Sequence, residues 1–199
     1  MPRIDTLLAA DGSVFGNLVP PILPESPRSW LPGRCIASPG APLRDQADES
    51  ALWKLRMGSA MPDLDAALDR ALASLPPAST LCLRPSADSV LSDVPTTLGL
   101  LRRFESRVEL LLAPADLIAP AMLPHASDHL IRILSAFESH PAVRGIILED
   151  LSGPGELAPA GTGLIKEPAW RHAMATVRRS AWPLVLGRHN RAGWLLGLT

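Results

Sequence analysis

Polar side chains that could do chemistry follow several apolar segments of this chain. Six of them lie at or just beyond the end of such a segment: Arg84, Asp116, Glu149, Asp150, Arg188 and His189. Carboxylates and imidazoles can transfer protons or hold cations, and a guanidinium group binds carboxylates and phosphates. We therefore predict a ligand-binding site built from these six side chains, without assigning a catalytic role to any of them.

Two interactions among these residues can be considered from the sequence: a salt bridge of Arg84 and a repulsion between Glu149 and Asp150. Arg84 can form a salt bridge with Asp116 or Asp150 instead of binding a ligand. Repulsion between Glu149 and Asp150 could raise the pKa of one carboxyl group and suit it to acid–base catalysis. However, successive residues of a strand point to opposite faces, so both carboxylates cannot line one pocket.

The remaining polar motifs are less specific. Residues 188–194 (RHNRAGW) could bind an anion or form an ordinary polar loop, and GTG at 161–163 lacks the third glycine of a dinucleotide-binding fingerprint. No serine has the surroundings of a nucleophile elbow. The histidines share no ligand spacing: they are His125, His129, His140, His172 and His189. We therefore predict no metal site and no cofactor.

The elements that must position these side chains alternate along the chain. Short apolar segments predict five strands, at 34–37, 80–84, 108–113, 143–149 and 183–187. Apolar residues at helical spacing predict helices at 63–75, 95–105, 127–139 and 168–180. Strands of this kind need cover on both faces, and their spacing accommodates a crossover helix. The pattern predicts an α/β fold of parallel βα repeats.

Length and proline content refine this prediction. Residues 1–33 contain a cluster of prolines, which favours an irregular N-terminal arm, and the βα-repeat domain would occupy 34–199. A complete (βα)8 barrel needs about 250 residues, so the chain would form a shortened or incomplete TIM-barrel-like domain. Its sheet would have open edges, and we expect a homo-oligomer or a protein partner to cover them.

Composition excludes several classes of protein. The 19 Lys+Arg and 20 Asp+Glu residues give a net charge of -1, which provides no basic surface for nucleic acid. We find no secretory leader and no apolar run long enough for a membrane span. The only cysteines, Cys35 and Cys82, are expected to be reduced. These features predict a soluble, cytoplasmic protein.

The order of elements from residue 34 onward resembles the later part of the xylose-isomerase-like TIM barrels, which include sugar-phosphate isomerases and epimerases and endonuclease-IV-type enzymes. The segments that carry the resemblance are TLCLRP, LLLAPAD, GIILED, AGTGLI and PLVLGRHN. The resemblance covers about residues 34–191 and rests on order and spacing. It implies a site at the carboxyl ends of the strands, where family members bind a divalent cation.

The sequence departs from the family at the implied metal ligands. Carried over one by one, the ligand positions fall on Arg84, Ala113, Asp116, Ile147 and Gly187. Only Asp116 could still bind a cation. The resemblance therefore implies a degenerate, non-catalytic domain: a binding protein or partner subunit with a small anionic or sugar-like ligand. The alternative is a sugar or sugar-phosphate isomerase or epimerase that uses non-standard residues such as Glu149, Asp150 or His189.

Overall fold

The computed structural model describes residues 6–19, 21–22, 30, 32–39 and 61–187. Its elements, in chain order, are the strands β1 (Thr6–Leu8), β2 (Val14–Leu18) and β3 (Arg34–Ala37), helix α2 (Met61–Ala73), β4 (Thr80–Leu83), helix α3 (Val94–Arg103), β5 (Val108–Leu112), the 3-10 turns η2 (Pro114–Leu117) and η3 (Pro120–His125), helix α4 (Ala126–Phe137), β6 (Val143–Ile146), the hairpin strands β7 (Glu149–Gly153) and β8 (Glu156–Pro159), and helix α5 (Glu167–Ser180).

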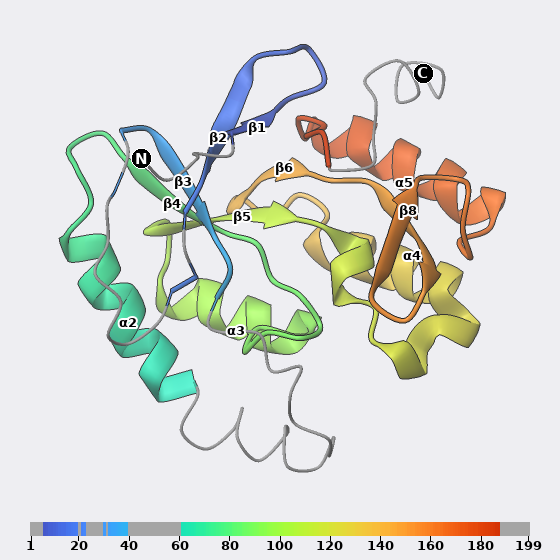
Figure 1. Cartoon of the computed structure of the whole chain (residues 1–199), viewed down its shortest axis with the longest axis horizontal. Helices are drawn as coiled ribbons and strands as arrows, with labels where there is room; N and C mark the ends of the chain where they lie inside the picture. The colour runs from blue at the N-terminus through green and yellow to red at the C-terminus, as the bar shows by residue number, and fades with distance from the viewer. Residues whose placement is uncertain (1–5, 20, 23–29, 31, 40–60, 188–199) are drawn as a thin grey trace.

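The main sheet is curled and mostly parallel. Its six strands follow the order β1-β2-β3-β4-β5-β6, with only the β1/β2 pair antiparallel (Figure 1). Parallel strands joined by helices are what the alternating apolar segments predicted. The α/β class is therefore confirmed, in the form of a half-barrel.

Alternate residues of each central strand enter two different cores. Leu81 and Leu83 of β4 pack in the larger core, together with side chains from α2, α3, α4 and α5. Cys82, between them, packs in a smaller core on the opposite face, beside Leu111. The period of two explains this division, since neighbouring side chains on a strand point to opposite faces. Burial also raises the pKa of the Cys82 thiol, and Glu109 adds to the effect.

The two edges of the curled sheet are connected by a segment near residue 185. The amides of Ala10 and Ile146 donate to the carbonyls of Leu184 and Pro183 at 2.8 and 3.0 Å. In return, the amides of Val185 and Leu186 donate to Ile146 and Leu8, both at 2.8 Å. The prediction of a strand at 183–187 was wrong, since residues 184 and 185 form only isolated bridges. Even so, this segment hydrogen-bonds to both β1 and β6.

Two other predictions need correction. Within the predicted irregular arm, residues 6–8 and 14–18 form strands that extend the sheet, because Leu7 and Phe15 supply apolar side chains to its inner face. The predicted strand at 143–149 ends at Ile146, and Glu149 begins a separate antiparallel hairpin. A continuous apolar run through Ile147 and Leu148 had hidden that boundary.

The helices agree with their predicted ranges to within about two residues. Helix α5 buries Trp170, Ala173, Met174 and Val177, the face that its spacing predicted. None of the described helices is long and apolar enough to cross a membrane.

Candidate functional site

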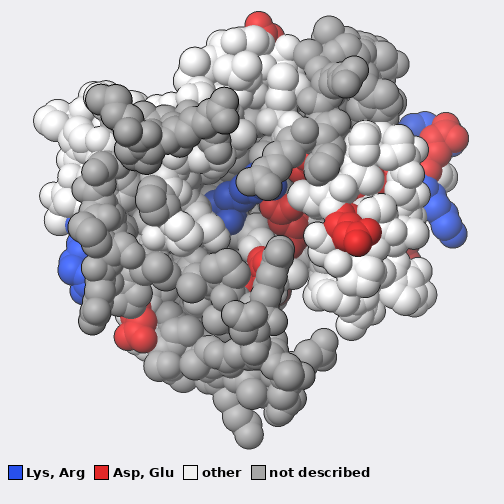
Figure 2. Space-filling view, viewed as in Figure 1, with Lys and Arg blue, Asp and Glu red and all other residues white. Residues whose placement is uncertain are grey.

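Arg84 is the centre of a charged cluster at the carboxyl ends of the strands. The amide of Arg84 extends the ladder of β4 by donating to the carbonyl of Ala37 at 3.0 Å. Because Leu83 packs in the larger core, the alternation of side chains along the strand directs Arg84 to the opposite, inner face of the sheet. Figure 2 shows basic and acidic side chains meeting in a hollow near the middle of the molecule, where β4 and β5 end.

Two carboxylates flank the guanidinium group of Arg84. Its Nε donates to Asp116 Oδ2 at 2.7 Å, and its Nη2 lies 3.8 Å from Glu149 Oε2. The exposed fractions of the side chains are 22% for Arg84, 11% for Asp116 and 2% for Glu149. The charges are therefore largely removed from water, and each carboxylate has the guanidinium group as an oppositely charged neighbour, as buried ions require. The salt bridge that the sequence suggested between Arg84 and Asp116 is confirmed.

Local structure explains how Asp116 reaches Arg84. Pro114 begins the 3-10 turn η2 directly after β5, and the Asp116 amide closes this turn on the carbonyl of Ala113 at 3.0 Å. The carbonyl of Asp116 accepts from the amide of Ala87 at 2.6 Å, which connects the turn to the loop after β4. The two loops that carry the ion pair are thus bonded to each other through their backbones.

Glu149 depends on a glycine opposite it. A Cβ atom built on Gly187 would lie 2.4 Å from Glu149 Oε1 and 2.5 Å from its Cδ. Only a residue without a side chain can approach the carboxylate so closely. Gly187 was not among the candidate residues. A glycine at the end of an apolar segment was the one signal of a close backbone approach.

Asp150 is buried apart from this cluster and serves a different purpose. Its Oδ1 accepts from the amides of Leu151 and Ile165 at 2.8 and 3.0 Å, and its Oδ2 accepts from Gly161 and Gly163 at 3.1 and 3.0 Å. These bonds fix the GTG segment, so its amides hold an internal carboxylate instead of a ligand phosphate. The hairpin places Glu149 and Asp150 in different surroundings, in agreement with the prediction that they do not share a pocket.

The structure thus brings together Arg84, Asp116 and Glu149 but separates Asp150 from them. The remaining candidates, Arg188 and His189, lie outside the described residues. Within the described part of the chain, no three His, Cys, Asp or Glu side chains are grouped so that they could hold a metal ion.

A second charged cluster, which the sequence reasoning missed, lies at the opposite, amino ends of the strands. Glu109 of β5 accepts from Arg34 Nε of β3 at 2.7 Å, from Arg144 Nε of β6 at 3.1 Å and from Thr80 Oγ1 of β4 at 3.2 Å. The available signal was Glu109 itself, a charged residue inside the apolar strand VELLL. A largely buried carboxylate of this kind needs cationic partners.

Comparison with known proteins adds no assignment. No protein-family model matches the chain, and no curated protein is similar to it in sequence. The resemblance to xylose-isomerase-like barrels therefore stays a prediction.

Proposed function

We propose that this chain is a non-catalytic binding or partner domain, a shortened and degenerate relative of the xylose-isomerase-like TIM barrels. One observation carries the proposal. At the strand ends, where α/β barrels bind and transform their substrates, the Arg84 guanidinium is paired with Asp116 at 2.7 Å and lies beside the buried Glu149.

The residues present do not fit the divalent cation of that family. A guanidinium cannot coordinate a metal ion, and its permanent charge repels one. Asp116, the one remaining family position with a ligand atom, already accepts a hydrogen bond from Arg84. Chemistry that needs a bound cation at this place therefore has no support in the described side chains.

Most of the described carboxylates at the strand ends are also unsuited to acid–base catalysis, because other groups already hold them. Asp150 accepts four backbone hydrogen bonds from its own hairpin and the following loop, an arrangement that fixes the loop and buries the carboxylate. Asp116 is held by Arg84. Glu149 is the one described carboxylate at the strand ends that the isomerase alternative could still use, so it is the residue to test.

The kind of ligand follows from the donors and acceptors in the cluster. Two carboxylates and one guanidinium group offer acceptors and donors side by side, with an excess of negative charge. Hydroxyl groups can use both, so a sugar-like ligand suits the cluster better than a small anion. Cys35 and Cys82 are buried and form no disulfide, which supports a reducing compartment such as the cytoplasm.

A partner subunit would use surface other than the edges of the sheet. Open edges were the reason for expecting an oligomer, and residues 183–186 hydrogen-bond to β1 and β6 within the same chain. Association therefore remains a prediction that needs a different surface.

The test is an assay of the full chain with a panel of aldoses, ketoses and their phosphates. Proton NMR in D2O would follow both binding and isomerisation or epimerisation, with and without added Mg²⁺, Mn²⁺ or Zn²⁺. We expect saturable binding of a hydroxylated ligand without turnover. Turnover that E149Q abolishes and E105Q, a substitution at an exposed glutamate, preserves would overturn the proposal in favour of the isomerase.

A further inference from the structure

We propose that the turn between α4 and β6 is a pH-sensitive element, in which protonation of His140 removes a hydrogen bond that holds Ala142. This turn lies at the opposite ends of the strands from the Arg84 cluster. Its behaviour is independent of the function proposed above.

The hydrogen bond joins the His140 ring to the backbone two residues further along the chain. The Ala142 amide donates to His140 Nδ1 at 3.2 Å. An imidazole nitrogen accepts only when it carries no proton, so a ring that accepts at Nδ1 is neutral and has its proton on Nε2. In the imidazolium form both ring nitrogens are donors. Protonation therefore sets two donors against each other and breaks the contact.

Ala142 also connects the turn to the sheet. Its carbonyl accepts from the amide of Leu110 in β5 at 2.8 Å, immediately before β6 begins at Val143. The turn has backbone hydrogen bonds as well: the His140 amide donates to the Phe137 carbonyl at 2.9 Å, and the Val143 amide donates to the His140 carbonyl at 3.1 Å. Loss of the side-chain bond would therefore loosen the turn and its contact with β5 without unfolding them.

The surroundings of the ring disfavour its charged form. His140 is partly buried, and the Phe137 ring packs beside it with the ring centres 6.4 Å apart. This burial lowers the pKa of His140, and the positive charge of Arg102 in α3 adds to the effect. The carbonyl end of α4 favours a positive charge, but the Phe137 carbonyl already accepts from the His140 amide. The ring is therefore neutral, and its hydrogen bond intact, at neutral pH.

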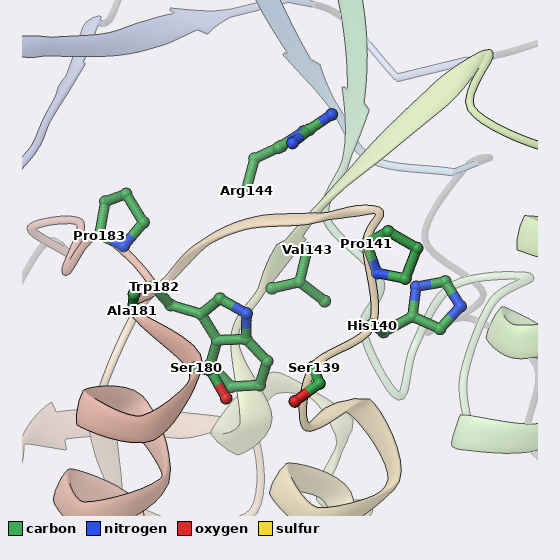
Figure 3. Close-up of a pocket in the computed structure, with 9 residues that line it drawn as sticks. All are labelled: Ser139, His140, Pro141, Val143, Arg144, Ser180, Ala181, Trp182 and Pro183. Atoms are coloured by element: carbon green, nitrogen blue, oxygen red, sulfur yellow. The ribbon is translucent and has the colours of Figure 1, made fainter.

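Other charged groups near the turn are engaged with each other. Arg144, at the start of β6, extends toward the strands, where its Nε donates to Glu109 at 3.1 Å (Figure 3). Glu138, at the end of α4, accepts from Arg179 of α5 at 2.6 Å. Among the described residues, Arg102 is the charged side chain that acts on the His140 ring.

The backbone beside the ring is strained and has room to move. An open hollow of about 380 Å³ is lined by His140 and by residues of the turn after α5, including Trp182 (Figure 3). Ser139 and Ala181, which also line it, have φ angles of +63° and +52°. Such angles cost energy in residues other than glycine and persist only while surrounding contacts hold them. The strain therefore favours movement of the turn once the hydrogen bond is lost.

The direction of the pH effect follows from the lowered pKa. Because folded His140 binds a proton less tightly than the unfolded chain does, its contribution to stability is complete above the ordinary pKa of 6.5. This contribution is lost as the pH falls through the folded value. The effect of Glu138 begins only below its own ordinary pKa of 4.5, so the two effects begin at different pH values.

The experiment is an NMR titration of the full chain from about pH 8 to about pH 4, which spans the ordinary and lowered pKa values of histidine. We expect the His140 ring to titrate with a midpoint below 6.5 and the Ala142 amide to shift with the same midpoint. Below it, the hydrogen-exchange rate of the Ala142 amide, corrected for the intrinsic effect of pH, should rise about tenfold, as for the loss of one hydrogen bond. The exchange rate of the Leu110 amide should rise with it.

Substitutions separate the charge of the ring from other effects of acid. H140N keeps a side-chain acceptor but takes up no proton in this range, so the Ala142 amide should no longer respond to pH. R102Q removes a positive charge and should raise the pKa of His140, whereas R132Q, at an exposed arginine of α4, should leave it unchanged. A midpoint at or above 6.5, an Ala142 amide that does not follow the ring, a response that persists in H140N, or equal effects of R102Q and R132Q would each overturn the proposal.

Discussion

The roles of single charged residues depend on what already neutralises them. Arg84 forms ion pairs with two carboxylates, and one of these, Glu149, is almost completely buried. Removing one member of a buried ion pair leaves the other charge uncompensated, which costs far more than the pair contributes as a whole. Removing Arg84 would therefore destabilise the protein mainly because the charges of Asp116 and Glu149 would lose their compensation.

The corresponding prediction concerns Arg84→Ala. We expect this substitution to lower the free energy of unfolding by about 3 kcal/mol, as measured by urea denaturation. R103A removes the partner of Asp65 in a pair whose side chains are 44% and 32% exposed, and it should cost less than about 1 kcal/mol. Similar losses in the two variants would show that the Arg84 cluster is not a buried network.

At the scale of secondary-structure elements, α4 and α5 are joined where both end. Arg179, in the last turn of α5, donates through Nε to Glu138 Oε1, just beyond α4, at 2.6 Å. This hydrogen bond lowers the pKa of the Glu138 carboxyl group below its ordinary value. Residues Ser139 and Ala181, both with positive φ, then turn the chain back toward the sheet.

The pH dependence of stability follows from this contact. Since the pKa of Glu138 is lower in the folded protein, its contribution to stability is present above the ordinary value of 4.5 and is lost as the pH falls through the folded value. We expect R179Q to reduce the loss of stability in this acidic range, as measured by denaturation at a series of pH values. R171Q, in a pair whose side chains are 73% and 80% exposed, should leave the profile unchanged; a profile unaffected by R179Q would contradict the assignment.

The elements that the sequence predicted well are those with one dominant local pattern. Strands β3, β4 and β5 are short apolar runs between turn signals, and the structure places them within one residue of the prediction. Helix α5 repeats its apolar residues at helical spacing. Such patterns are local, so they can be read without knowing the rest of the fold.

The parts that were missed depend on distant partners. Strand β2 lies near a cluster of prolines, and only its pairing with β3 shows that it belongs to the sheet. The contact of Arg84 with Asp116 was open to prediction because both follow neighbouring strands. By contrast, the four amides that surround Asp150 come from a hairpin and a loop whose path no local pattern reveals.

At the scale of the whole molecule, the smaller core holds the curled sheet together. Phe15 of β2 lies against Gly145 of β6, and a Cβ atom at 145 would lie 2.7 Å from two carbons of the Phe15 ring and 2.9 Å from Val185 Cγ2. The bare backbone of Gly145 thus lets opposite parts of the sheet approach each other. Both neighbours belong to the smaller core.

We predict that Gly145→Ala destabilises the protein by about 1–3 kcal/mol through overpacking, and that adding F15L recovers part of this loss. Urea denaturation of the single and double variants measures both effects. The matched control is G99A in α3, where the nearest atom to a new Cβ is Arg103 Nη1 at 3.7 Å; this change should stabilise the helix by about 0.5–1 kcal/mol. A neutral G145A would contradict the close packing.

The bridge between Ala9 and Val185 also determines when folding can finish during synthesis. Because the ribosome releases the chain from its N-terminus, β1 through β6 emerge before the segment that connects β1 to β6. Until that segment emerges, the nascent sheet has two unpaired edges, which makes it prone to aggregation. A contact between residues so distant in the sequence also slows folding. The sheet of the nascent chain can therefore be completed only late in synthesis.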